Sequence, residues 1–112
     1  MTKAEANEVL VKVATIIEQH IELDKFADEK GLSICIEHNR EIHLLYGSFM
    51  RLAHALGATI HYNPNWGDYL DYNNNLIKQP NGEVYTNMEL CGHTYHVFAL
   101  WDKTKGVVKN GE

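Results

Sequence analysis

The N-terminal quarter of the chain carries apolar residues at a helical spacing. They form one stripe, which consists of Ala6, Val9, Leu10, Val13, Ile16, Ile17 and Ile21. Thr2 and Glu5 fit a capping box, in which the two side chains satisfy backbone N–H groups of the first turn. Gly31 suits a helix end because glycine adopts a left-handed conformation at little cost. The pattern therefore predicts a helix over residues 3–29 whose apolar stripe is buried.

Beyond this helix the pattern changes to the alternation of a β-strand. Residues 32–38 and 41–45 alternate in this way and are separated by Asn39-Arg40, which predicts an antiparallel pair with a tight turn. Ser48 is then expected to cap a second helix that ends at Gly57. Residues 58–62 read as a further strand, and residues 68–72 as a short strand inside a turn-rich segment.

The strongest strand pattern lies near the C-terminus. Residues 84–90 and 93–101 flank Cys91-Gly92, a two-residue loop of the type that joins hairpin strands. This loop sets the register and pairs Leu90 with His93 and Val84 with Ala99. The same register gives the hairpin one apolar face, which we expect to point inward, and one polar and aromatic face.

These elements predict an α+β fold. We expect a long N-terminal helix and a second short helix packed on one face of a mainly antiparallel sheet, which buries both apolar stripes. We expect residues 1–102 to form a single domain and residues 103–112 to form a flexible tail.

Charge and composition narrow the possible partners. The 112 residues carry a net charge of −5, and residues 41–102 contain two Lys or Arg against six Asp or Glu, which disfavours direct nucleic-acid binding. No segment resembles a signal peptide or a membrane span. The two cysteines, Cys35 and Cys91, are therefore expected to be reduced in the cytoplasm.

The only local grouping with catalytic or metal-binding side chains is Cys91, His93 and His96. In the predicted strand the two histidines point to opposite faces, so they cannot share one ion. The Cys91 thiol is also expected to be exposed at a hairpin tip, and no helix N-terminus, which commonly activates a cysteine, lies beside it. We therefore predict no catalytic residue, no metal and no cofactor. A small-molecule or metal site, or a weak enzyme, built on this cluster remains the alternative.

The segment from residue 62 to residue 72 is the best candidate for a binding surface. Large amphipathic rings on a turn-rich backbone are typical of interface hot spots. The plainer interpretation is that some of these rings cap the edge of the core, and self-association is a further use of the same surface. The predicted contact residues are Tyr62, Trp66, Asp68, Tyr69, Asp71, Tyr72 and Glu89.

Two stretches resemble small proteins encoded by phages and mobile elements of Gram-positive bacteria. The first is Ile42-His43-Leu44 leading into residues 48–53, and the second is the late hairpin over residues 88–100. The resemblance implies a binding protein, because some such proteins block host defences such as CRISPR by binding an effector. The sequence thus predicts a non-enzymatic, cytoplasmic protein-binding module, most concretely an inhibitor that occupies a partner's basic surface.

Overall fold

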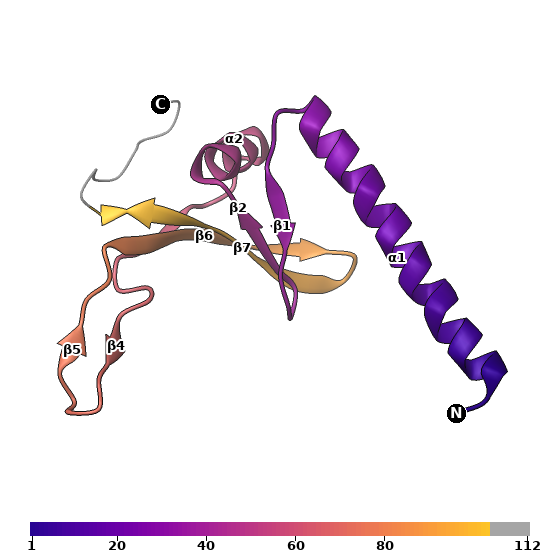
Figure 1. Ribbon diagram of the computed structural model, residues 1–112. Helices are drawn as coiled ribbons and strands as arrows, with labels where there is room; N and C mark the ends of the chain where they lie inside the picture. The colour runs from indigo at the N-terminus through magenta and orange to yellow at the C-terminus, as the bar shows by residue number, and fades with distance from the viewer. Residues whose placement is uncertain (104–112) are drawn as a thin grey trace. The chain divides into compact units, whose positions relative to one another are not determined.

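The computed structural model describes residues 1–103 (Figure 1) and confirms the α+β class. The chain forms two compact units, residues 1–32 and a second unit that begins at Ser33. The prediction of a flexible tail falls on residues 104–112, which lie outside the described part. Lys103 lies inside it, and its backbone N–H donates to the Pro80 carbonyl at 3.3 Å.

The first unit is dominated by helix α1, Lys3–Glu29, with the bounds that the sequence predicts. Its capping box is formed: Thr2 Oγ1 accepts from the Glu5 N–H at 3.1 Å, and Glu5 Oε1 accepts from the Thr2 N–H at 2.9 Å. After the helix, Gly31 adopts a φ of +69°. The terminal residues therefore set the helix limits as expected.

The expected burial of the α1 stripe is wrong. Val9 and Val13 are 49% and 45% exposed, and Ile16 is 66% exposed. Within residues 1–32 there is one helix, and a helix cannot bury its own apolar face without a second surface. Of the α1 residues only Ala27 is buried. The periodicity thus predicted the stripe correctly, but not what covers it.

The second unit is built on a five-stranded sheet in the order β1-β2-β7-β6-β3. Its strands are β1 (Ile34–Ile36), β2 (Glu41–Leu44), β3 (His61–Asn63), β6 (Asn81–Leu90) and β7 (His93–Asp102). Neighbours run antiparallel except β2 and β7, which are parallel, with Ile42 opposite Val97. This parallel pair joins the two predicted hairpins into one sheet.

The β6–β7 hairpin has the predicted register. Leu90 pairs with His93, and Val84 pairs with Ala99. Cys91 and Gly92 both have positive φ, 53° and 80°, as a type I′ turn requires. The β1–β2 hairpin is confirmed in the same way, because Asn39 and Arg40 have φ of 57° and 59°.

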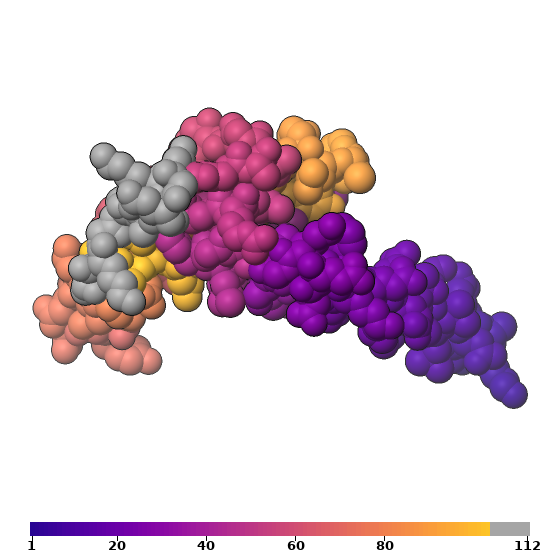
Figure 2. Space-filling view, turned by 90° about the horizontal axis from the view of Figure 1, so that it is seen from above, coloured from indigo at the N-terminus to yellow at the C-terminus, as the bar shows by residue number. Residues whose placement is uncertain are grey.

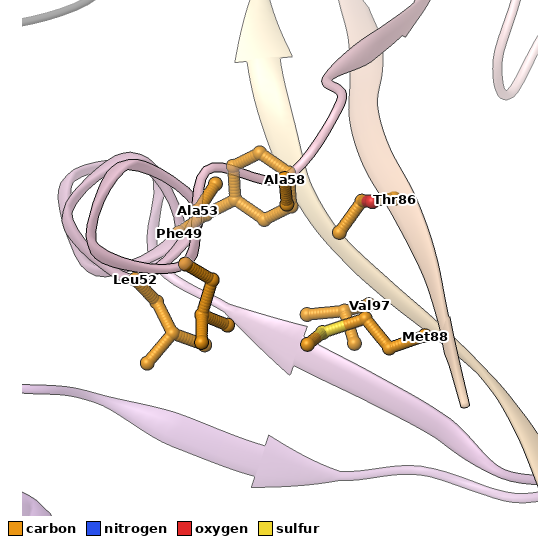
Figure 3. Close-up of a pocket in the computed structure, with 8 residues that line it drawn as sticks. Phe49, Leu52, Ala53, Ala58, Thr86, Met88 and Val97 are labelled. Carbon is orange, nitrogen blue, oxygen red and sulfur yellow. The ribbon is translucent and has the colours of Figure 1, made fainter. Parts of the chain in front are cut away.

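Helix α2, Tyr46–Leu56, covers one face of the sheet, and Gly57 ends it with a φ of +61°. Figure 3 shows Phe49 and Ala53 on the helix directed toward Thr86, Met88 and Val97 on the strands. The space between these side chains has essentially no volume that water could occupy. Phe49 and Val84 are almost completely buried here, so this contact is the centre of the core.

The predicted capping role of Ser48 is wrong. The helix begins at Tyr46, Leu45 is the N-cap residue, and no side chain caps this end. Ser48 is 7% exposed, and its hydroxyl accepts a hydrogen bond from the Ser33 N–H at 3.0 Å. A buried hydroxyl needs a partner, and here it serves the backbone before β1.

Between β3 and β6 the chain leaves the sheet and forms a small second sheet from β4 (Tyr69–Leu70) and β5 (Leu76–Ile77). We call residues 64–79 the arm. Figure 1 shows the arm extending away from the sheet, and Figure 2 shows it beyond the part of the unit that α2 covers. A strand was expected over residues 68–72, whereas its partner β5 was not. Residues 58–62 were also expected as a strand, which is observed only from His61 to Asn63.

Candidate binding surface

The base of the arm is fastened by Asp68. Its Oδ1 accepts from the Gln79 N–H at 2.8 Å and lies 3.8 Å from Lys103 Nζ, and the side chain is 10% exposed. The carboxylate therefore links the two ends of the arm to each other and to the end of β7. Sequence reasoning assigned Asp68 to partner contact, but these bonds give it a structural role, because a mostly buried and paired carboxylate is a poor recognition charge.

The tip of the arm is a loop organised by Asp71. Its Oδ1 accepts from the backbone N–H groups of Asn73 and Asn75, at 2.8 and 2.9 Å. The backbone closes the same loop, because the Asp71 N–H donates to the Asn75 carbonyl at 3.0 Å and the Asn74 N–H donates to the Asp71 carbonyl at 3.1 Å. Asn74 adopts a φ of +61°. The hydrogen bond from the Asn75 N–H lowers the pKa of the Asp71 carboxyl, and the bonds from the Asn73 N–H and the Asn75 side chain add to this effect.

Tyr72 follows Asp71 and has no cover at all, with a relative exposure of 106%. Tyr69 is 53% exposed in β4. The register places Leu70 opposite Leu76, and both are more than half exposed. The arm therefore carries apolar side chains that contribute little to its own core. Tyr69 and Tyr72, which the sequence predicts as contact residues, are thus exposed.

Tyr62 and Trp66 differ from these tyrosines. Tyr62 packs on the core and meets Trp101 edge-to-face, with ring centroids 5.7 Å apart. Trp66 lies at the base of the arm and is 37% exposed. Tyr62 therefore matches the plainer interpretation of a ring at the core edge, whereas Trp66 retains a partly accessible surface.

Glu89 lies apart from the rest of the predicted site. It stands next to the β6–β7 turn, whereas the arm joins the other end of β6, and Figure 1 shows the two regions at opposite ends of the sheet. At about 3.4 Å per residue, the eight steps along the strand from Asn81 to Glu89 span roughly 27 Å. Glu89 Oε1 also accepts from the Thr94 hydroxyl at 2.5 Å. It therefore cannot share one small contact surface with the arm.

The sequence reasoning missed a row of rings on the sheet face opposite α2. The row contains His43, Phe98, His96, Tyr85 and His61, with successive ring centroids 4.8 to 5.4 Å apart. The rings come from β2, β7, β6 and β3. The alternation within each strand shows which rings share a face. The row also depends on the parallel pairing of β2 with β7, which brings His43 beside Phe98 and which no local pattern reveals.

A buried carboxylate holds this row in place. Glu83 is 4% exposed, and its carboxylate is bonded to His96 Nε2. The other ring nitrogen of His96 lies 3.3 Å from Asn87 Oδ1. Because both ring nitrogens have partners, His96 is fixed in orientation and forms part of the sheet face.

The Cys91, His93 and His96 side chains do not converge. Cys91 lies in the exposed turn, and the pairing of β6 with β7 puts His93 and His96 on opposite faces. Among residues 1–103, no group of three or more His, Cys, Asp or Glu side chains could hold a metal ion. Cys35 is exposed, and the neighbouring Glu37 carboxylate raises the pKa of its thiol, which makes the thiolate less available.

The second unit also has an open depression of about 390 Å³ at the edge of the sheet. Its lining includes Leu56 and Ala58 at the end of α2, and Thr86 and Met88 on β6. No helix among residues 1–103 is both long and apolar enough to cross a membrane.

Comparison with known proteins adds no family to this geometry. Neither the family models, nor the curated proteins, nor the solved structures give a match. The function of this chain must therefore be inferred from its own residues.

Proposed function

We propose that this protein is a non-enzymatic protein-binding module whose contact surface is the tip of the arm. The observation that carries the proposal is a fully exposed tyrosine on an organised loop: Tyr72 stands between Asp71 and Asn73, and the Asp71 carboxylate accepts the backbone N–H groups that close the loop.

The organised loop matters because binding costs conformational entropy. A loop that is already ordered loses less freedom when it meets a partner, so more of the contact energy appears as affinity. Tyrosine suits this position because it offers a large amphipathic surface with only two side-chain torsions. Tyr69, Leu70 and Leu76 add exposed apolar area along the arm.

We propose a protein partner with a basic surface. Residues 33–103 contain four Lys or Arg and seven Asp or Glu, so a basic partner is drawn to this unit by long-range attraction. Direct nucleic-acid binding is opposed by the same charges. The resemblance to phage and mobile-element proteins supports a concrete version, an inhibitor of a host defence protein such as a CRISPR effector in the bacterial cytoplasm.

The test compares two variants of the full chain as affinity baits. Tyr72→Ala removes the proposed anchor, whereas Cys91→Ser with His93→Ala removes two members of the alternative chemical cluster. This pair leaves His96 in place, so the buried Glu83 keeps its partner. Proteins captured from lysates of Gram-positive bacteria are identified by mass spectrometry, and the affinity of each captured protein is then measured by calorimetry.

We expect Tyr72→Ala to weaken binding of the captured protein by more than about 1 kcal/mol, as loss of a hot-spot tyrosine does. The Cys91/His93 pair is expected to bind like the wild type. Association should slow as salt is added, because the attraction between an acidic and a basic surface is screened. Equal binding by wild type and Tyr72→Ala, with loss in the Cys91/His93 pair, would move the function to the turn of the β6–β7 hairpin.

A further inference from the structure

Helix α1 carries a repeat that is more regular than an ordinary amphipathic stripe. Residues spaced alternately by three and four positions form one seam: Ala6, Val9, Val13, Ile16, His20, Leu23 and Ala27. A mean spacing of 3.5 residues is the repeat at which two helices wind around each other in a left-handed coiled coil. Six of the seven side chains are apolar, and the seam runs nearly the whole length of α1.

The side chains of this seam are open in the structure. Val13 and Ile16 are 45% and 66% exposed, and Leu10 and Ile17 on its flank are 64% and 51% exposed. A continuous apolar surface of this length on an otherwise charged helix marks an interaction site, because water contact with it is unfavourable. The face opposite the seam carries Glu18 and Lys25, which are side chains suited to solvent.

We propose that the seam packs against the same seam of a second copy of this chain, with the two α1 helices antiparallel. The charges favour this arrangement. The first half of α1, residues 3–16, has two Lys and two Glu, whereas the second half, residues 17–29, has one Lys and five acidic residues. A parallel pair would place the two acidic halves together, and an antiparallel pair places each acidic half against a neutral one.

Antiparallel registers that align the two seams differ by seven residues, and the one with the longest overlap of α1 is centred on Val13 and Ile16. Val13 of one copy lies against Ile16 of the other, on both sides of a two-fold axis, as a closed symmetric dimer requires. The same register pairs Ala6 with Leu23 and Val9 with His20. Residues 3–26 of the two helices then overlap, which is about 36 Å at 1.5 Å per residue.

The first test measures the mass of the full-length protein by analytical ultracentrifugation over a wide range of concentrations. We expect twice the 12.8 kDa of one chain, with dissociation on dilution. Ile16→Glu should shift the equilibrium to the monomer because it puts a charge into the seam. Val11→Glu is the matched control, because Val11 is 65% exposed on the opposite face, and it should leave the dimer intact.

A monomeric wild-type protein at all concentrations would overturn the proposal, as would a dimer that Ile16→Glu leaves unchanged or that Val11→Glu dissociates equally. In these cases a different surface, either elsewhere in this chain or on another protein, covers α1.

The second test reports the orientation of the helices and does not depend on a charged variant. In a Cys35→Ser and Cys91→Ser background, Ala6→Cys and Leu23→Cys are prepared as separate proteins and mixed under mild oxidation. The antiparallel register predicts a disulfide between the two different variants and none within either variant alone. Disulfides within each variant alone would show a parallel pair and overturn the proposed orientation, and the absence of any disulfide would overturn the register.

Discussion

Two successive hairpins of the second unit, β4–β5 and β6–β7, are built in opposite ways. The β6–β7 hairpin has strands of ten residues each, and one of its faces packs under α2 with Val84 and Ala99 fully buried. The β4–β5 hairpin has strands of two residues each, and Leu70 and Leu76 on it stay more than half exposed. Both are antiparallel pairs, yet only the β6–β7 hairpin is stabilised by the burial of apolar side chains.

The difference shows where stability and recognition reside in this protein. The long hairpin derives its stability from apolar area removed from water. The arm has little such area and depends on two carboxylates, Asp68 at its base and Asp71 at its tip. Side chains that are not needed for the core, such as Tyr72, are free to contact a partner.

The largest effect is expected when a charge is placed on the buried face of the long hairpin, and the same change on the arm is the comparison. Val84→Asp introduces an unpaired charge at a site with 0% exposure, so we expect it to unfold the second unit, at a cost of more than about 4 kcal/mol. Leu70→Asp on the arm is the matched change, and we expect its free energy of unfolding to stay within about 0.5 kcal/mol of the wild type. Urea unfolding followed by circular dichroism measures both. A similar cost for the two variants would contradict the division into a buried and an exposed hairpin.

A smaller effect is expected at Gly82, where the long hairpin begins. A Cβ on Gly82 would come within 2.5 Å of Trp101 Cε3 and 2.9 Å of the Asn63 carbonyl oxygen. Gly82→Ala is therefore expected to destabilise the protein by about 1–3 kcal/mol through overpacking. Gly47→Ala is the control, because a Cβ there meets nothing within 4 Å, and alanine in helix α2 should stabilise it by up to roughly 1 kcal/mol. Thermal unfolding of both variants gives the comparison, and equal destabilisation would refute the packing argument.

The register of the long hairpin could be predicted to the residue because its signals are local, although β6 begins three residues before the predicted Val84 and β7 ends one residue after the predicted Trp101. Alternation along β6 and β7 defines two faces, and Cys91-Gly92 in between sets the register. The parallel pairing of Ile42 with Val97 could not be predicted in this way, since it joins segments that are far apart in sequence. The exposure of the α1 stripe was missed for a related reason, because periodicity identifies an apolar face but not its partner.

The candidate site could be predicted only in part. Clustering of aromatic residues in turn-rich sequence located the arm and its exposed Tyr69 and Tyr72. The roles of Asp68 and Asp71 could not be predicted from composition. Both carboxylates accept backbone hydrogen bonds, and the sequence does not distinguish such a carboxylate from one that contacts a partner. Glu89 was grouped with them on charge alone, and the length of β6 separates it.

A still smaller and more local effect is expected at the base of the arm. Asp68→Ala leaves the Gln79 N–H without its acceptor, so we expect a loss of about 1 kcal/mol and a looser arm. Amide hydrogen exchange at Gln79 should speed up, while exchange at Val97 in the long hairpin should change little. Glu89→Ala is the control, because it removes an exposed carboxylate far from the arm. Unchanged exchange at Gln79 would show that other contacts hold the base.

The smallest effect is expected when low pH protonates the Asp71 carboxylate at the tip of the arm. The hydrogen bond from the Asn75 N–H lowers the pKa of the Asp71 carboxyl below its ordinary value of 3.8, and the carboxylate is the form that orders the loop. A lowered pKa in the folded state means that this contribution is complete above the ordinary value and is lost as the pH falls through the lower, folded value. Proton–nitrogen NMR spectra should therefore show the Asn73 and Asn75 amides titrating together with a midpoint below 3.8. Asp71→Asn should abolish this titration, and resonances of the β6–β7 hairpin should not follow it. A midpoint at or above the ordinary value would mean that the loop is not organised by the carboxylate, and Tyr72 would then lose the pre-ordered position on which its proposed role depends.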